Sequence, residues 1–162
     1  MSGDDIRDLM MAVIHDDLAA FEEARATGLT FDDTEVAPYR SILSWAAEWG
    51  RTTIVELLLD AGAPHEPLAL GVAAHKGHVE TVRCLLGRGF DPNLPTDFPP
   101  LCAAADRCSI ECVEALLEGG ADPTLSTGPD HDRWSNRTAL ELALDRSWPP
   151  CEDVAALLRS VS

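Results

Sequence analysis

The chain has 162 residues, of which 46% are apolar, and this length and composition fit one compact domain with a continuous core. Its 28 acidic and 12 basic residues give a formal net charge of −16, so the surface should repel nucleic acid and anionic membranes. The same charge attracts basic proteins and speeds their encounter, although it could serve only to keep the protein soluble and monomeric.

The first segment, residues 1–35, is strongly acidic and contains a short helical pattern near residues 9–27. Its opening residues are acidic where a secretory signal would be basic. No apolar run approaches the length of a membrane-spanning helix. We therefore expect a cytoplasmic protein. A single lysine among the basic residues, with abundant alanine, is typical of a GC-rich bacterial genome.

From residue 41 onward, one sequence motif recurs at a period of roughly thirty residues. Near-complete copies occupy residues 41–63, 68–91 and 99–122, and a looser copy occupies residues 138–160. This self-similarity predicts a stacked array, because each unit can bury its apolar face only against the next one. Such an array offers an extended surface for holding another macromolecule.

Each copy predicts two helices. In residues 110–118 the apolar side chains recur at helical spacing, and the glutamates fall on the opposite, wet face. The shorter first helix, as in residues 103–105, consists of small residues that let neighbouring helices approach closely. A glycine follows each second helix and can end it in the left-handed conformation; these glycines are Gly62, Gly89 and Gly120.

These copies resemble the ankyrin repeat, whose pattern runs Thr-Pro-Leu-His-x-Ala-Ala, then Gly-His, a Val/Leu-rich helix and a closing Gly-Ala-Asp. The resemblance implies an all-α solenoid of about five stacked helix-turn-helix repeats, joined by connecting fingers and closed by degenerate capping repeats. We expect one ankyrin-repeat domain over residues 1–162. Its expected parts are an N-terminal capping repeat, three central repeats, and a long finger with a C-terminal capping repeat, at 1–35, 36–66, 67–95, 96–124 and 125–162.

Three positions depart from the ankyrin pattern, and one histidine matches it. Leu68 and Gly71 stand where the family has Thr and His, and Cys108 stands where it has Gly. We expect the helix starts at these departures to be distorted. His78 matches the Gly-His position, where the resemblance implies a structural histidine that caps the helix or bonds backbone locally.

The finger before the last copy carries an insertion at residues 125–137, rich in Ser, Thr, Gly, Pro and Asp. Insertions in repeat proteins go to loops on one face, often the binding face. A tolerated surface insertion without a role is an equally good interpretation. Within it, Asp130-His131-Asp132 is interpreted as a solvated polar loop rather than a cation site.

The five cysteines are odd in number and lack the spacing of a disulfide framework. We interpret them as reduced thiols, most of them buried as small hydrophobic residues. Cys108 and Cys112 are one turn apart, but no second pair or histidine motif completes a zinc site. The chain also has no Gly-rich phosphate loop, Gly-x-Ser-x-Gly elbow or His-Glu-x-x-His helix. We expect no metal, no cofactor and no enzyme activity.

In ankyrin arrays the residues after Ala-Ala and those of the fingers line a groove, so the resemblance implies a set of partner-binding positions. They are Glu48, Trp49, His75, Lys76, Asp97, Phe98, Asp106, Arg107, Trp134, Arg137 and Asp145. We expect Trp49 and Asp106 to be exposed. Trp49, Phe98 and Trp134 are candidate anchors, because exposed aromatics ringed by charge are common interface anchors. Trp134 could instead pin its own loop.

The sequence thus predicts a non-catalytic protein that binds another protein and is monomeric when free. One hypothesis is an acidic inhibitor, because the chain resembles the small acidic immunity proteins that neutralise toxins and effectors. Its groove and fingers would then cover the active site of a basic partner. The alternative is a general adaptor or regulator that binds a housekeeping or host protein.

Overall fold

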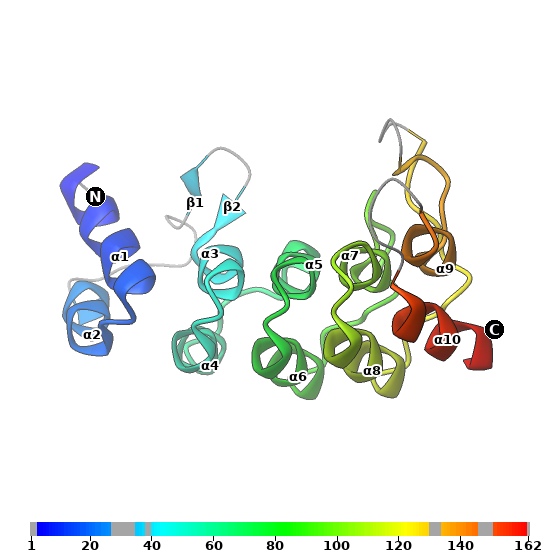
Figure 1. Ribbon diagram of the computed structural model, residues 1–162. Coiled ribbons are helices and arrows are strands. Elements are labelled where there is room, and N and C mark those ends of the chain that lie inside the picture. The colour runs from blue at the N-terminus through cyan, green and yellow to red at the C-terminus, as the bar shows by residue number, and fades with distance from the viewer. Residues whose placement is uncertain (1–2, 27–34, 38–39, 130–133, 146–150, 162) are drawn as a thin grey trace.

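The computed structural model describes residues 3–26, 35–37, 40–129, 134–145 and 151–161. Within these residues the helices follow one another in pairs along the chain (Figure 1). They are α1 (Gly3–His15), α2 (Leu18–Ala26), α3 (Ile42–Glu48), α4 (Thr52–Asp60), α5 (Pro67–Lys76), α6 (Val79–Gly87), α7 (Pro100–Asp106), α8 (Ile110–Glu118), α9 (Ala139–Ala143) and α10 (Glu152–Val161).

The pairs stack into two rows (Figure 1). Helices α3, α5, α7 and α9 form the first row, and α4, α6, α8 and α10 form the second. In the first row, α5 packs against both α3 and α7, and α7 packs against α9. This confirms the predicted all-α repeat solenoid. Before α3, the short strands β1 (Glu35–Ala37) and β2 (Arg40–Ser41) pair in an antiparallel ladder.

The core lies between the rows, as the apolar pattern predicts. In α8, Val113 and Leu116 are fully buried, whereas Glu111 and Glu114 face solvent. The first row is built from small residues, which lets its helices pack closely. Its buried alanines are Ala46, Ala47, Ala69, Ala73, Ala74, Ala103, Ala104, Ala105, Ala139 and Ala143.

Side-chain hydrogen bonds join each repeat to the one before it. Nε2 of His78 donates to the backbone oxygen of Glu48 over 3.0 Å. The role of His78 is therefore structural, as expected, but its partner lies in the preceding repeat rather than nearby. Arg51 holds the same position one repeat earlier and donates to the backbone oxygens of Val13, over 3.1 Å, and of Ile14.

The departures from the ankyrin pattern do not distort the helices, so that expectation was wrong. Helix α5 is regular and begins at Pro67, where the missing N–H would have no intrahelical partner anyway. Cys108 adopts a φ of 57°, the left-handed conformation that glycine takes without steric cost. The glycines predicted to end second helices have φ values of 89°, 87° and 86°, at Gly62, Gly89 and Gly120.

Two of the five cysteines form a disulfide, which corrects the expectation of reduced thiols. Cys108 and Cys151 are bonded with their Cα atoms 5.4 Å apart. They are separated by 43 residues, and only the stacking of the last repeat on its neighbour brings them together. Cys102 and Cys112 are buried free thiols, and Cys84 is half-buried. Burial raises the pKa of Cys102 to about 12, which keeps this thiol protonated and unreactive.

Candidate protein-binding site

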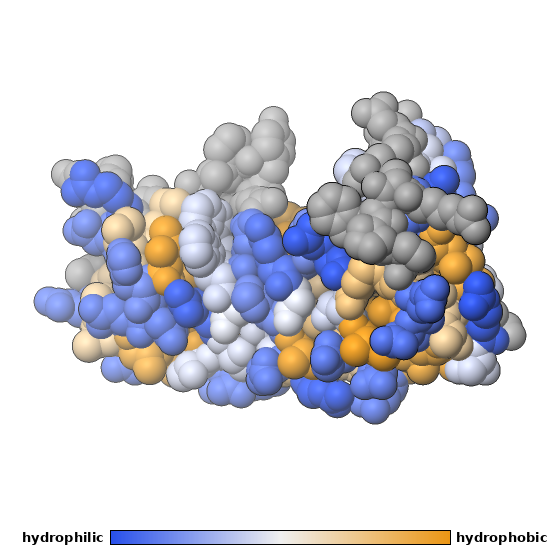
Figure 2. Space-filling model, viewed as in Figure 1, coloured by the Kyte–Doolittle hydropathy of each residue, from blue (hydrophilic) through white to orange (hydrophobic). Residues whose placement is uncertain are grey.

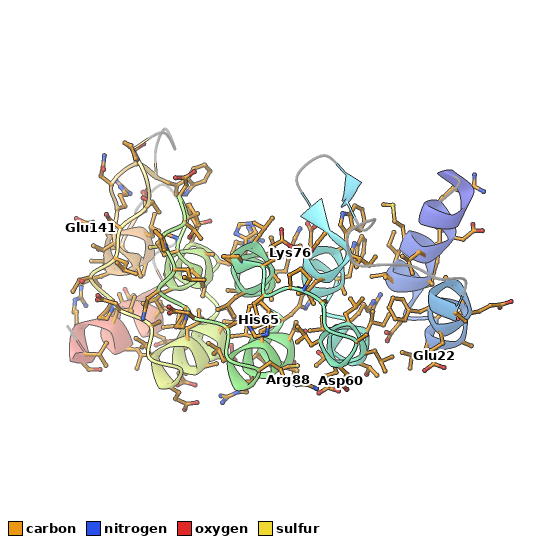
Figure 3. The ribbon with its side chains drawn as sticks, turned by 180° about the vertical axis from the view of Figure 1, so that it is seen from behind. Glu22, Asp60, His65, Lys76, Arg88 and Glu141 are labelled. Carbon is orange, nitrogen blue, oxygen red and sulfur yellow. A yellow bond between two sulfur atoms is a disulfide. The ribbon has the colours of Figure 1, made fainter. Side chains whose placement is uncertain are left out.

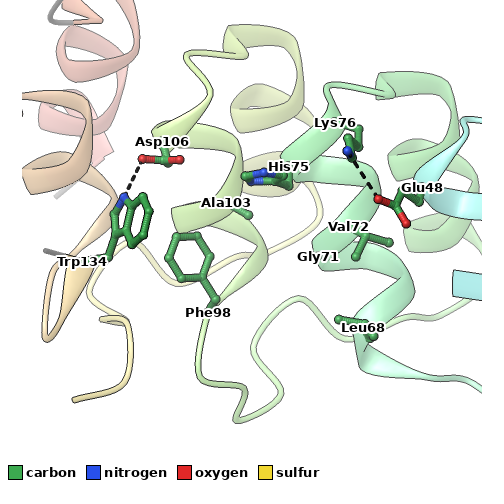
Figure 4. Close-up of a pocket in the computed structure, with 10 residues that line it drawn as sticks. All are labelled: Glu48, Leu68, Gly71, Val72, His75, Lys76, Phe98, Ala103, Asp106 and Trp134. Carbon is green, nitrogen blue, oxygen red and sulfur yellow. Dashed lines mark hydrogen bonds and ion pairs between the residues drawn. The ribbon is translucent and has the colours of Figure 1, made fainter. Parts of the chain in front are cut away.

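A partly open pocket of about 470 Å³ lies on the first row of helices (Figure 4). Its size falls in the range of roughly 300–1,000 Å³ that is usual for ligand sites. The lining comes from α3, α5, α7, the segment before α7 and the long finger: Glu48, Leu68, Gly71, Val72, His75, Lys76, Phe98, Ala103, Asp106 and Trp134. The structure therefore brings together six of the eleven positions expected from the sequence.

One wall of the pocket is aromatic. The rings of Phe98 and Trp134 meet edge to face, with centroids 6.5 Å apart and an interplanar angle of 86°. The indole Nε1–H of Trp134 donates to Oδ1 of Asp106 over 2.9 Å (Figure 4). Phe98, Trp134 and Asp106 are each half-buried, so the expectation of exposed side chains was wrong for these three. Trp134 both pins its finger to α7 and lines the pocket.

Further hydrogen bonds hold the described part of the finger against the array. Thr127 is buried, and its backbone N–H donates to the oxygen of Arg137 over 2.9 Å. The N–H of Gly128 donates to the backbone oxygen of Asp97 over 2.7 Å. The side chain of Asp97 remains exposed. Asp130-His131-Asp132 lies outside the described residues.

The opposite wall carries charge. Nζ of Lys76 lies 3.3 Å from a carboxylate oxygen of Glu48 (Figure 4). His75 is half-buried beside them, and its pKa is lowered from 6.5, chiefly by burial and then by the positive charges of Arg107 and Lys76. Burial and these two cations together outweigh the carboxylates of Asp106 and Glu48, which raise the pKa of His75. The His75 imidazole is therefore neutral at pH 7.

The remaining predicted residues lie outside the pocket. Trp49 follows α3 and is 43% exposed, as expected. Arg107 follows α7 and is also exposed. Arg137 and Asp145 form an ion pair of 2.6 Å, which ties the finger to the end of the last first-row helix. That pair is therefore internal to the array.

Sequence reasoning did not include four lining residues: Leu68, Gly71, Val72 and Ala103. The sequence did carry a signal for Leu68 and Gly71, because both residues depart from the ankyrin pattern. Val72 and Ala103 carry no such signal, because they look like ordinary residues of the first row.

A group of exposed carboxylates lies away from the pocket, on the second row. The exposed ones there include Glu56, Asp60, Glu80, Glu111, Glu114, Glu118, Glu152 and Asp153. Hydrophilic residues gather along the lower edge in Figure 2, over this row. Figure 3 shows the same row from behind, with Asp60 beside Arg88. This 2.6 Å pair and the 2.9 Å pair of Arg83 with Glu118 neutralise only part of the charge.

Metal-ligand clusters and membrane-spanning helices are both absent from the described part of the chain. Among those residues, no three His, Cys, Asp or Glu side chains are grouped so that they could hold a metal ion. None of the described helices combines the length and the apolar character needed to cross a bilayer.

Paired helices stacked in two rows, with a side-chain-lined pocket on the first row, define a helical repeat protein with a surface for binding. A family model for ankyrin repeats matches the chain three times, over residues 9–96, 43–127 and 70–160. The chain belongs to the ankyrin repeat family, and this membership indicates a protein–protein interaction module of a typically non-enzymatic kind. No curated protein matches the sequence at a significant level.

Proposed function

We propose that this protein is a non-catalytic inhibitor of the immunity type, which binds a basic toxin or effector through the pocket and the surrounding face of the first row. The observation that carries the proposal is the pocket itself, where the rings of Phe98 and Trp134 and four carboxylate-bearing or basic side chains line one partly open surface. Convergent aromatic and charged groups are the usual centre of a protein interface.

The net charge supports a basic partner. With a formal charge of −16, the protein attracts cationic surfaces over about a Debye length, roughly 8 Å at physiological salt. The exposed carboxylates of the second row, together with the acidic residues elsewhere on the surface, would steer the partner toward the molecule. The pocket and its rim would then fix the docked position. Trp49, exposed beside Glu48 in the sequence, is the outlying anchor of the same face.

Affinity capture from the native cell tests the proposal. The bait is the wild-type protein, and the groove variant is Trp49→Ala/Leu68→Ala, which removes two exposed apolar side chains. The matched control is Leu18→Ala/Leu144→Ala, since both leucines are 39% exposed but lie outside the pocket lining. We expect one basic protein bound at equal stoichiometry to wild type and control, and lost from the groove variant.

The adaptor hypothesis remains the second candidate, because ankyrin arrays serve many functions on one fold. Several substoichiometric partners in the same capture would favour it. Retention of a single partner by the groove variant would show that the protein binds through another face, and the proposal would then be wrong.

The dependence of binding on salt tests the role of the charge. We expect the association rate of the captured partner to fall several-fold between low and physiological salt, because screening shortens the reach of the acidic surface. A rate that does not change with salt would mean that the charge serves solubility alone.

We also propose that the free protein is a cytoplasmic monomer that binds neither nucleic acid nor membranes. Three free cysteines are consistent with a reducing compartment. The Cys108–Cys151 bond is not, because disulfides are rare in the cytosol and persist in oxidising compartments. Native cells can be separated into a cytosolic fraction and a fraction from oxidising compartments. The fraction that contains the protein, and thiol labelling of Cys108 and Cys151 in it, would decide between the two locations.

A further inference from the structure

The pocket exists where one repeat lacks a side chain that the others have. Gly71 occupies the place held by Ser44, Cys102 and Glu141 in the neighbouring copies. Each of those three makes a side-chain hydrogen bond: Ser44 to Glu66, Cys102 to the backbone oxygen of Leu125, and Glu141 to Thr138. At Gly71, an added Cβ would meet only the backbone oxygen of Phe98, at 4.0 Å. The vacated space opens toward solvent as the pocket.

The walls around Gly71 suit a long side chain with a flat end. Leu68 and Val72 offer apolar surface on one side, and Phe98 and Trp134 offer aromatic surface on the other (Figure 4). A volume of about 470 Å³ exceeds what one methyl or isopropyl group would fill. Planar cations stack favourably on such rings, and tryptophan is the strongest of the aromatic partners.

The charges that line the pocket leave one negative group. Lys76 is paired with Glu48 at 3.3 Å, and His75 is neutral. Oδ1 of Asp106 accepts the hydrogen bond from the indole of Trp134, and the other carboxylate oxygen faces the side of the pocket where His75 lies (Figure 4). Arg107 is exposed next to Asp106 and weakens the negative field from outside the lining. The remaining carboxylate oxygen is an acceptor for a cation that enters between the two walls.

We propose that this pocket receives an arginine side chain of the partner protein. Its guanidinium donates to Asp106 and stacks against the aromatic wall, while its alkyl stem lies on Leu68 and Val72. Arginine fits better than lysine, because a planar guanidinium can stack and donate in a fixed fork, whereas an ammonium is a compact, strongly hydrated charge. This inference rests on the proposed function, since it names the group by which a basic partner is held.

A single-residue probe tests the proposal with the full-length protein. N-acetyl-arginine methylamide is titrated while the indole N–H signal of Trp134 and the amide signal of Gly71 are followed by NMR. The matched probes are the citrulline analogue, which has the same shape without charge, and the lysine analogue. We expect saturable shifts with arginine, and an affinity at least about tenfold weaker for citrulline and lysine.

Two variants localise the effect. Asp106→Asn keeps an oxygen that can accept from Trp134 but removes the charge, and should weaken arginine binding about tenfold. Gly71→Leu fills the pocket from its floor and should abolish the shifts. The unchanged far-ultraviolet circular dichroism of each variant shows that it is folded. Equal binding of citrulline, undiminished binding by Asp106→Asn, or no shift up to the solubility limit of the probe would each overturn the proposal.

The outcome is separable from that of the proposed function. If the Trp49→Ala/Leu68→Ala variant loses the partner but the arginine probe causes no shift, the partner docks on this face without an arginine in the pocket. If the probe binds as expected but the captured partner is retained by that variant, the pocket binds arginine and the proposed inhibitory interface is wrong.

Discussion

The imidazole ring of His78 fills the space that a side chain at Gly50 would need. A Cβ built on Gly50 would lie 2.6 Å from Nδ1 of His78, well inside van der Waals contact. The ring cannot move aside freely, because its Nε2 is bonded to the backbone oxygen of Glu48 in the preceding repeat. Gly50 also has a φ of 67°, which disfavours any residue with a Cβ. The glycine and the histidine therefore form one joint between two repeats.

Gly50 and Gly71 should respond in opposite directions to the same substitution. Gly50→Ala should lower the free energy of unfolding by at least about 2 kcal/mol, through left-handed strain and the clash with His78. Gly71→Ala should raise it by about 0.5–1 kcal/mol, because Gly71 lies within a helix and its Cβ has room. Urea unfolding measures both. Equal effects of the two changes would contradict this account of the joint.

Removing the indole N–H should loosen the long finger. Trp134→Phe keeps an aromatic ring beside Phe98 but leaves Asp106 without its 2.9 Å donor. We expect a loss of about 1–3 kcal/mol, the usual cost when a charged acceptor loses its hydrogen bond. Hydrogen exchange at the amides of Thr127 and Gly128 should also accelerate. If exchange there stays at the wild-type rate, other contacts hold the finger.

Reducing the disulfide should destabilise the C-terminal end of the array. Closing a loop of this length contributes about 2–4 kcal/mol, so reduction should lower Tm by roughly 5–15 °C. The Cys108–Cys151 bond joins the turn after α7 to the start of α10. Exchange should therefore increase mainly in α10, as measured by mass spectrometry with and without a thiol reductant. A uniform increase across all helices would contradict this local effect.

A pair of variants separates the bond from the backbone conformation of Cys108. Both Cys108→Ser/Cys151→Ser and Cys108→Gly/Cys151→Ser lack the disulfide. The glycine version should be more stable by about 1 kcal/mol, because residue 108 has a φ of 57°. Equal melting temperatures for the two variants would mean that the left-handed conformation at residue 108 is lost with the bond.

The titration of His75 should make the protein less stable in weak acid. Its folded pKa lies below the ordinary 6.5, because of burial and then of Arg107. As the pH falls through 6.5, the unfolded chain binds a proton that the folded protein does not yet bind. The free energy of unfolding should therefore fall from about pH 6.5 toward the folded pKa, and be unaffected by this group at higher pH.

Comparison with His75→Gln isolates this contribution, because the other histidines are present in both proteins. The difference in stability between wild type and variant should change only in weak acid. An NMR titration should give a midpoint for His75 below 6.5. A midpoint above 6.5 would mean that Asp106 and Glu48 outweigh the burial and the two cations.

The helical pattern of the sequence was sufficient for the fold. The glutamate stripe of α8 and the glycines after the second helices predicted where helices run and end, because these signals act over one or two turns. The pocket was only half predicted. His75 and Asp106 follow the small residues of their helices, so the resemblance placed them on the face where the pocket lies, but the burial of Phe98 and Trp134 depends on how a long finger folds back.

The disulfide illustrates why local reasoning fails at such places. Cys108 and Cys151 have no framework spacing, and Cys108 looked like a mere replacement for glycine. Their pairing depends on how the last repeat stacks, which is set by contacts between segments far apart in the chain. The same holds for the bond between Trp134 and Asp106, which joins the finger to α7 across 28 residues.

The sequence by itself determined the repeat architecture, the helix boundaries signalled by glycine, and the strongly acidic charge. Each of these properties follows from residue types and short-range periodicity alone. The tertiary structure alone decided where a pocket opens, since Gly71 removes a side chain from α5 while α7 and the finger supply the walls. A cavity is defined by surfaces from several segments, and no single segment carries the information that the others will leave the space empty.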